Sequence, residues 1–522
     1  MFRRAAVVAV LAALVGALAS LWISNPDPDP EPPAPKISGR NNTVLYLTDS
    51  SSGLSNNHIA SAFALLESRP DIQIYWGSFG SPPIEPRLQR VFQAAELRNP
   101  NVIPISFHDL GATSTLDVLR RKYGTLDKFI TDHGLKGYDK MLPIMETILM
   151  PWKITQYFAL FQKTMKLIDS VDPAVIVVDG LPLPFVDAAR DSNRLFAVLN
   201  PNVLVNVIGH CQPRGEMFWK YPALASGHQF PVRAHSVLQN IWMQIRFTAM
   251  IVSPKLTAAR TELKALGIKD PLNLQTQWDD VPLISGDFPE ASLPLSYYPP
   301  NVTTCGPMVL DTAPAEQQSL ELFRWLSQGP STMLVCLGSD FKYDRKMALE
   351  MGAALLRVLD ETDVQILWKF EREEEERPFS AAHHMLDRHI RSGRIKIQKW
   401  LDADPVSLVN TGMIDVWVHH GSASSYYEAA MAGVKQVIVP MWLDQYNYAQ
   451  IAEYVGVGIW AGKDMAPVWD DKILRDGFVT ALSGGKADAM QKKADALRKA
   501  AARYSGRDCA ARKIARMAGT GH

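Results

Sequence analysis

The chain has 522 residues, 47% of them hydrophobic and 21% charged, and its 54 lysines and arginines balance 54 aspartates and glutamates. This length gives room for two sizeable domains, each with its own core. The formal net charge of zero predicts no basic face for nucleic acid. The four cysteines, Cys211, Cys305, Cys336 and Cys509, are too few and too scattered for a disulfide scaffold, and Cys336 is expected to be a buried thiol in an apolar strand.

Residues 1–24 are predicted to be an N-terminal signal anchor or signal peptide. Two arginines precede an apolar run, Ala5–Ile23, that is just long enough to span a bilayer with its N-terminus in the cytosol. Ala17-Leu18-Ala19 is instead typical of a signal-peptidase site, where cleavage would release the protein. Both alternatives favour a secretory route, with the protein either anchored in the membrane of the endoplasmic reticulum or another secretory compartment, or secreted.

A rigid, acidic, proline-rich linker is expected over residues 25–40. Asp27, Asp29 and Glu31 alternate within it, but the prolines between them argue against a metal site. On a secretory route, Asn41-Asn42-Thr43 and Asn301-Val302-Thr303 would be glycosylation sites.

The first folded half is predicted over residues 41–285. Asn42–Thr48 is expected to form a strand, followed by a serine-rich loop to Asn57, a helix that opens at His58, and a second strand at Ile72–Trp76. His58 would therefore lie at a loop-to-helix junction, where a neutral histidine is suited to take a proton from a hydroxyl. A histidine that only caps the helix is the alternative.

Two strongly apolar segments, Met141–Phe161 and Val237–Val252, also belong to this half. They either line a pocket for a hydrophobic ligand or dip into a membrane surface, or they are core helices. Between them, Pro173–Val178 is expected to be a buried strand that ends at Asp179. Residues 286–331, which are rich in proline, are expected to be a linker.

The second folded half is predicted over residues 332–485. It opens with a strand at Thr332–Leu337, the turn Gly338-Ser339 and a strand at Val364–Lys369. The C-terminal region, residues 486–522, is expected to contain an Ala/Lys/Arg-rich helix.

A turn rich in small residues follows a further predicted strand, Ile414–Val418, and precedes a helix. The turn reads His-His-Gly-Ser-Ala-Ser-Ser over residues 419–425. Such a turn presents backbone NH groups and the positive end of the helix dipole, which favours phosphate. Alternatively, Ser425 and Glu428 form a capping box with a purely structural role. Asp444-Gln445 follows the next strand, at the sheet edge where α/β proteins bind ligands.

The order and spacing of residues in this region resemble the donor-binding signature of the UDP-glycosyltransferases. The matching residues are Trp400, His420-Gly421, Ser425, Glu428, Gly433-Val434, Pro440 and Asp444-Gln445. The resemblance implies a divergent, fungal-like member with an α/β GT-B fold, in which two Rossmann-like domains face each other with parallel sheets across a cleft. Ser422, Ser424 and Lys435 depart from the family pattern, so the transferred sugar is not specified.

The resemblance also implies how a UDP-sugar is held. Trp400 would stack on the uracil, and Glu428 would bind the ribose hydroxyls. The diphosphate would face Gly338, Ser339, His420, Gly421, Ser422, Ser424 and Ser425, and the sugar hydroxyls would face Asp444 and Gln445. The UDP-sugar is then a co-substrate, and no other cofactor and no metal is expected. Asp402-Ala403-Asp404 has the spacing of a metal-binding acidic motif, but it lies inside the donor signature.

The family's catalytic histidine lies in the loop after the first strand, so His58 is expected to be the general base, oriented by Asp179. The acceptor hydroxyl would attack the anomeric carbon in a single displacement and invert its configuration. The resemblance and the apolar segments together suggest transfer of a hexose to a hydrophobic small molecule or lipid. The C-terminal helix would pack back on the N-terminal domain. The alternative is a catalytically silent partner subunit of the same fold that binds a nucleotide sugar or a lipid.

Overall fold

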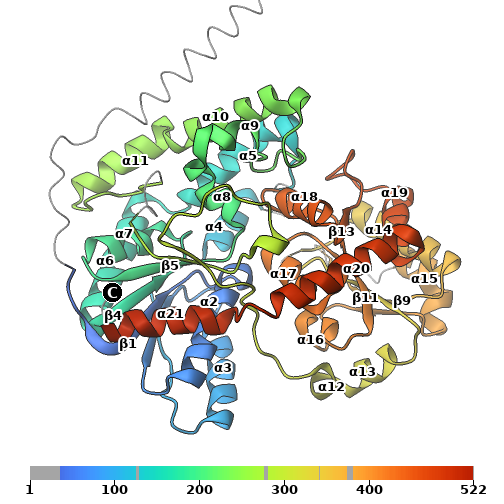
Figure 1. Cartoon of the computed structure of the whole chain (residues 1–522), viewed down its shortest axis with the longest axis horizontal. Helices are drawn as coiled ribbons and strands as arrows, with labels where there is room; N and C mark the ends of the chain where they lie inside the picture. Colours follow the sequence, from blue (N-terminus) through green and yellow to red (C-terminus); the bar gives the residue numbers. More distant parts are fainter. Residues whose placement is uncertain (1–35, 125–128, 275–279, 340, 373–379, 521–522) are drawn as a thin grey trace, which may run out of the picture. The chain divides into compact units, whose positions relative to one another are not determined.

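Two sheets of parallel strands form the framework of the computed structural model, which describes residues 36–124, 129–274, 280–339, 341–372 and 380–520 (Figure 1). The first sheet has seven strands in the order β3 (Ser106–Asp109), β2 (Gln73–Ser78), β1 (Arg40–Leu47), β4 (Pro173–Val178), β5 (Phe196–Asn200), β6 (Leu283–Ser285) and β7 (Val302–Thr304). The second has six, in the order β10 (Ile395–Gln398), β9 (Gln365–Lys369), β8 (Thr332–Val335), β11 (Ile414–His419), β12 (Lys435–Ile438) and β13 (Gly458–Trp460). The predicted α/β fold with two parallel sheets is confirmed.

The strands of the first sheet are buried on both faces, because alternate side chains point to opposite sides. Leu45 and Leu47 of β1 pack on one side, and Val44 and Tyr46 pack on the other. The first side is covered by α5 (Gly134–Leu149), α6 (Ile154–Val171), α7 (Leu183–Asp191), α8 (Leu204–Ile208), α10 (Val237–Ile251) and α11 (Pro254–Ala265). The second side is covered by α2 (Ser52–Ser68), α3 (Glu85–Arg98) and α21 (Arg507–Thr520).

The two apolar segments of this half contribute largely to that core. Met141, Trp152 and Tyr157 are buried within it. In the second segment Met243 is buried, whereas the Trp242 side chain is 40% exposed. The short helices α4 (Thr115–Tyr123) and α9 (Glu216–Trp219) complete this half. Core packing therefore accounts for most of the hydrophobicity of these segments.

The second sheet is covered in the same way. One side packs against α14 (Arg345–Glu361), α15 (Ser380–Arg391) and α19 (Asp471–Leu482). The other packs against α13 (Leu320–Leu326), α16 (Pro405–Val409) and α17 (Ala423–Ala432), and α12 (Ala315–Gln318) precedes α13. The helices α18 (Gln445–Val455) and α20 (Gly484–Ala501) join a cluster that also contains Val203, Tyr221 and Phe288 of the first half. This shared core joins the halves within one unit of the chain, residues 38–522.

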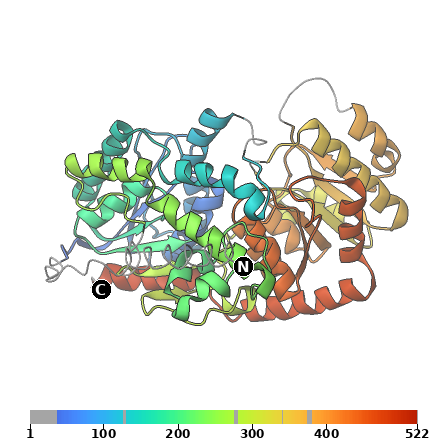
Figure 2. The ribbon, with the colours of Figure 1, turned by 90° about the horizontal axis from the view of Figure 1, so that it is seen from above.

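The chain returns to the first sheet at its end. The expected C-terminal helix is divided into α20 and α21 by a break at residues 502–506. The α21 helix packs on α2, β1 and β4, and in both views it lies against the half that contains the first sheet (Figure 1, Figure 2). The strand β7 lies inside the range predicted as a linker, where it adds an edge strand to the first sheet.

The membrane prediction falls on residues that the structure does not describe. Residues 1–24 lie outside the described ranges, as do Asp27, Asp29 and Glu31. A search of the described helices finds none with the length and hydrophobicity of a bilayer span.

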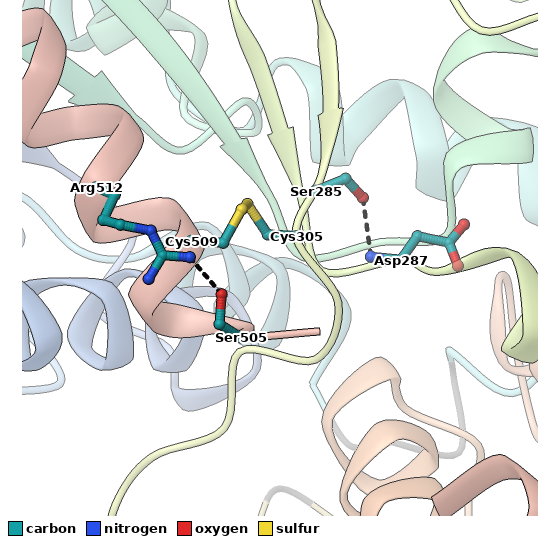
Figure 3. The surroundings of a disulfide bond; sticks show 6 residues. All are labelled: Ser285, Asp287, Cys305, Ser505, Cys509 and Arg512. Carbon is teal, nitrogen blue, oxygen red and sulfur yellow. Dashed lines mark hydrogen bonds between the residues drawn. A yellow bond between two sulfur atoms is a disulfide. The ribbon is translucent and has the colours of Figure 1, made fainter. Parts of the chain in front are cut away.

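A disulfide connects Cys305, just after β7, with Cys509 in the first turn of α21 (Figure 3). The sequence predicted that the cysteines are too few and too scattered for a disulfide scaffold, and it did not indicate this single pair. They lie 204 residues apart in sequence, and only the return of α21 to the first sheet brings them together. Cys336 is a free, buried thiol, as predicted. The disulfide therefore fastens the end of the chain beside the point where it leaves the first sheet.

Removing this disulfide is expected to destabilise the protein. The double variant Cys305→Ala/Cys509→Ala should lose about 2–5 kcal/mol of unfolding free energy, because the link constrains a long loop in the unfolded chain. Thermal or denaturant unfolding under non-reducing conditions measures the change. Cys211→Ala, which removes a free cysteine, is the matched control and should unfold like the wild type. Equal stability of the double variant and the wild type would contradict the expectation.

Candidate functional site

The carboxyl ends of four neighbouring strands bring most of the predicted donor residues to one edge of the second sheet. The strand order is β10-β9-β8-β11. Trp400 follows β10, Gly338 and Ser339 follow β8, and His420 follows β11. Lys369, the last residue of β9, lies between them in the strand order and was not singled out from the sequence. Because the strands are parallel, these segments meet at the edge where α/β sheets bind ligands.

The turn after β11 is held by a buried histidine. His419 is fully buried, and burial lowers its pKa to about 3, so the ring is neutral. Its Nε2 bonds the side-chain oxygen of Gln436 at 2.9 Å, and its Nδ1 accepts the Gly421 amide hydrogen at 3.1 Å. One NH group of the predicted phosphate turn is thus used within the turn. Gly421 itself has φ +92, and a Cβ there would lie 2.9 Å from Ile438 and 3.0 Å from the Gln445 carbonyl, so the turn requires glycine.

The helix after this turn starts earlier than the capping box predicted. Ser422 is the N-cap of α17, and its oxygen accepts the Ser425 amide hydrogen at 3.4 Å. Ser425 therefore lies inside the first turn, and the interpretation of Ser425 as the cap was wrong. The reason is that both serines have a hydrogen-bonding side chain near the helix start, and the sequence does not tell which one takes the extended backbone conformation. The N-terminus of α17, with Ser422 and Ser424 partly exposed, still faces the sheet edge described above.

His420 and Gly338 lie directly against each other. Gly338 has φ +94, and a Cβ at this position would lie 2.7 Å from Cε1 of His420. Only glycine allows this approach together with this backbone conformation. The two turns that the family resemblance assigns to the diphosphate are therefore in contact.

Trp400 is the most exposed tryptophan side chain of the described residues, at 61%. The ammonium of Lys369 lies 4.5 Å from the centre of its ring. An exposed indole at the ligand-binding edge of a sheet is suited to stack on a flat base. Its place after β10 agrees with the uracil platform expected from the sequence.

The predicted acidic residues lie on α17 and at the start of α18. Glu428 is partly buried. Its pKa is raised to about 8, mainly by burial and to a smaller extent by the charge of the nearby Asp404. Burial raises the pKa of Asp444 to about 6. Gln445 is buried, and its side-chain oxygen accepts the Met441 amide hydrogen at 2.9 Å. The described residues contain no group of side chains arranged to hold a metal ion, Asp402 and Asp404 included.

A small cavity separates α17 from the first half. Its walls come from Asn56, Asn57 and Pro201 on one side and from Ala423, Ser424, Tyr427 and Glu428 on the other, with residues 308–310 between. The cavity thus brings the N-terminal part of α2 opposite the N-terminus of α17.

The sequence predicted that His58 opens the helix. This was wrong, because His58 lies in the second turn of α2. The helix α2 begins at Ser52, which turns Asn56 and Asn57 toward the cavity and buries the ring of His58 completely. The Nδ1–H group donates to the Leu54 carbonyl at 3.1 Å, and the buried Nε2 forms no hydrogen bond of standard geometry among the described residues. Burial lowers the pKa of His58 to about 4, against the opposing effect of the Leu54 and Val178 carbonyls.

Asp179 lies directly after β4, as predicted, and is buried. Its carboxylate accepts amide hydrogens from Leu181 at 3.0 Å and from Asp49 at 3.4 Å. The pKa of Asp179 is raised to about 7, mainly by burial and to a smaller extent by the charge of Asp49. Within the described ranges no hydrogen bond or ion pair joins Asp179 to His58. His58 lies on α2, which follows β1, and Asp179 follows β4, the neighbour of β1 in the sheet; their catalytic pairing stays a prediction.

Two hydrogen bonds that the sequence did not reveal hold α17 to the first half. The Tyr427 hydroxyl donates to the Asp287 carboxylate at 2.9 Å, and the Tyr426 hydroxyl donates to the Ala291 carbonyl at 2.7 Å. Asp287 also accepts from the Leu204 amide and the Ser292 hydroxyl. The only sequence signal was a pair of tyrosines at the start of a helix, which periodicity places in a core.

The sequence is similar to those of known glycosyltransferases. A family model described as UDP-glucoronosyl and UDP-glucosyl transferase matches residues 229–466. The glycosyltransferase sdnJ of Sordaria araneosa is 31% identical over 433 residues, which cover 81% of this chain and 84% of that protein. UDP-glycosyltransferase 708G2 of Citrus unshiu is 27% identical over 146 residues, which cover 27% of this chain and 30% of that protein.

Solved structures share the fold at low identity. A UDP-glucosyltransferase from Polygonum tinctorium superposes with a TM-score of 0.62 at 15% identity, covering 92% of this chain and all of that one. UGT71G1 of Medicago truncatula, solved with UDP-glucose, gives a TM-score of 0.61 at 14% identity, covering 92% of this chain and 98% of that one. At such identities the likeness shows a common GT-B architecture.

The contact between Gly338 and His420 predicts a selective loss of ligand binding. Gly338→Ala should destabilise the fold by about 1–3 kcal/mol because of its positive φ, and it should also displace His420 and weaken UDP binding, measured by calorimetry. Gly393→Ala is the matched control, because Gly393 has φ +76 but nothing within 4 Å of an added Cβ. The control should lose stability and keep UDP binding. Unchanged UDP affinity in Gly338→Ala would disprove the role of this contact.

Proposed function

Because the chain belongs to the UDP-glycosyltransferase family, we propose that it transfers a hexose from a UDP-sugar, with inversion, to a hydroxyl group of a hydrophobic small molecule or lipid. The family membership makes the protein a UDP-dependent glycosyltransferase. The observation that supports the finer proposal best is the row of Trp400, Gly338 and His420 at one sheet edge, next to the start of α17, which shares a cavity with residues of α2.

The donor is held along this edge. Trp400 stacks on the uracil, and Glu428 binds the ribose hydroxyls, since both side chains retain exposure. The diphosphate lies against Gly338, Ser339 and His420, and against the N-terminus of α17. There the side chains of Ser422, Ser424 and Ser425 supply hydroxyl groups beside the Gly421 backbone, while the Gly421 and Ser425 NH groups are bonded within the turn. Asp444 and Gln445 face the sugar. No metal takes part in this proposal, because the helix terminus and the histidine meet the charge of the diphosphate.

The acceptor loses its proton to His58 as it attacks the anomeric carbon from the face opposite UDP. The new glycosidic bond forms while the bond to the β-phosphate oxygen breaks, and UDP leaves with the electron pair. The neutral His58 ring, with Nδ1–H fixed on Leu54, has its lone pair on Nε2, which supports the role. Since the ring is fully buried, the role requires a movement of α2 or its preceding loop that exposes Nε2 to the acceptor. Asp179 would then stabilise the imidazolium.

A hydrophobic acceptor is supported by two observations. On α10, the side chains of Leu238 and Trp242 are 73% and 40% exposed, so apolar surface is available in the acceptor half. The enzyme of Polygonum tinctorium is described as capable of glucosylating indoxyl, a small aromatic molecule, and was solved with 3,4-dichloroaniline.

We also propose that the chain enters the secretory route, anchored by residues 1–24 or released after their cleavage. The Cys305–Cys509 disulfide supports this proposal, since disulfides persist in oxidising compartments. Asn41 and Asn301 would then be available to glycosylation.

Substitution of the proposed base tests the chemistry. His58→Ala and Asp179→Asn should each lower kcat by about 10²–10⁴-fold with UDP affinity unchanged, because general-base catalysis has this magnitude. Turnover of a panel of UDP-sugars, with hydrolysis and transfer both measured, gives the rates. Asp187→Asn is the control, because burial also raises the pKa of Asp187 to about 7, but its partners are Tyr157 and Leu272.

Asp187→Asn should retain wild-type activity, and the anomeric configuration of the product, read by NMR, should be inverted. Full activity of His58→Ala would remove His58 as the base and leave the Asp179 carboxylate as the group to test. Binding of UDP-sugars without any turnover by the wild type would contradict the proposed transfer.

A further inference from the structure

Lys369 is a buried lysine in the middle of the proposed donor site. It ends β9, and only 5% of its side chain is exposed. Its ammonium donates to the Gly338 carbonyl at 3.0 Å and lies 4.5 Å from the ring centre of Trp400. A single cation therefore touches both the proposed uracil platform and the proposed diphosphate turn.

Among the described residues, one carboxylate forms an ion pair with this lysine. It is that of Glu371, at 3.8 Å, and this distance is long for a hydrogen-bonded ion pair. Glu371 also pairs with Lys342, at 3.4 Å. A buried ammonium is stabilised by a nearby anion, and a bound diphosphate at this sheet edge would supply one.

The strand order defines where that anion would lie. β9 stands between β10, which leads to Trp400, and β8, which leads to Gly338. A nucleotide stacked on Trp400 with its phosphates near Gly338 and His420 must pass over the end of β9. The ammonium of Lys369 is thus next to the path from base to phosphate.

We infer that Lys369 is a donor-binding residue that pairs with the diphosphate of the UDP-sugar. This inference rests on the proposed donor site. When the bond between the anomeric carbon and the β-phosphate oxygen breaks, the electron pair stays on UDP, and the ammonium stabilises the added negative charge. The contact with Gly338 holds the cation in place beforehand, so no reorganisation is needed when the charge develops.

A purely structural lysine would behave differently. If the ammonium only fixed Trp400, its loss would weaken the binding of uridine and UDP alike, because both ligands need the same base platform. If it only fixed the Gly338 turn, its loss would weaken UDP binding without changing the ionic-strength dependence of that binding. A lysine that pairs with phosphate is needed for UDP and much less for uridine, and its loss lowers the ionic-strength dependence. The ratio of the two affinities and the ionic-strength dependence together separate these roles.

The test is the dissociation constant of UDP and of uridine, measured by calorimetry on the full chain for wild type, Lys369→Gln and Lys369→Arg. Lys369→Gln should weaken UDP binding by about tenfold or more, the size of a charge-assisted hydrogen bond, and uridine binding by less than about threefold. The ionic-strength dependence of UDP binding should also fall. Lys369→Arg retains the charge and should keep a UDP-to-uridine preference close to that of the wild type.

Lys342→Gln is the matched control, because Lys342 shares Glu371 but is 44% exposed and has no contact with Trp400 or Gly338 among the described residues. It should bind UDP like the wild type. An equal loss of UDP and uridine binding in Lys369→Gln, or no loss at all, would overturn the inference while leaving the donor site intact. Failure of the wild type to bind either ligand would instead refute the proposed donor site. Melting curves of each variant confirm that it is folded.

Discussion

The proposed donor site depends on one constraint, the parallel alignment of β10, β9, β8 and β11. Gln398 of β10 pairs with Lys369 of β9, and Val335 of β8 pairs with both Trp368 of β9 and Val418 of β11. The carboxyl ends of the four strands are therefore aligned. An aromatic ring, an ammonium, a glycine turn and a histidine then follow in a row, although they come from distant parts of the sequence. An antiparallel strand in this row would send its turn to the opposite edge and divide the site.

The other half is joined to this edge through buried contacts of α17. Tyr427 and Tyr426 donate hydrogen bonds to Asp287 and Ala291 across the shared core. The segment that receives these bonds leaves the first sheet after Ser285, and it lies near the Cys305–Cys509 disulfide (Figure 3). The helix that carries the proposed phosphate site is thus fixed to the half that carries His58. The proposed transfer needs this alignment, because in the proposal the donor binds to one half and the acceptor to the other.

The sequence predicted the strands, and the position of the proposed donor residues at the strand ends, better than it predicted helix starts. Runs such as Pro173–Val178 are apolar and β-branched, and they matched strands closely. The start of α2 was placed at His58 instead of Ser52, because Asp49 to Asn57, apart from Leu54, are small or polar residues that suit a loop as well as a first helical turn. The disulfide, the Tyr427–Asp287 bond and the contacts of Lys369 depend on residues more than 30 positions apart, so no local pattern indicates them.

The most direct test of the central claim, that a nucleotide sugar binds along the carboxyl edge of the second sheet, is hydrogen–deuterium exchange with and without UDP. The account predicts protection of backbone amides at residues 338–339, 369–371, 400–401 and 420–425, which lie apart in sequence and together only in this fold. Protection that is confined to other surfaces, or its absence at saturating UDP, would contradict the account.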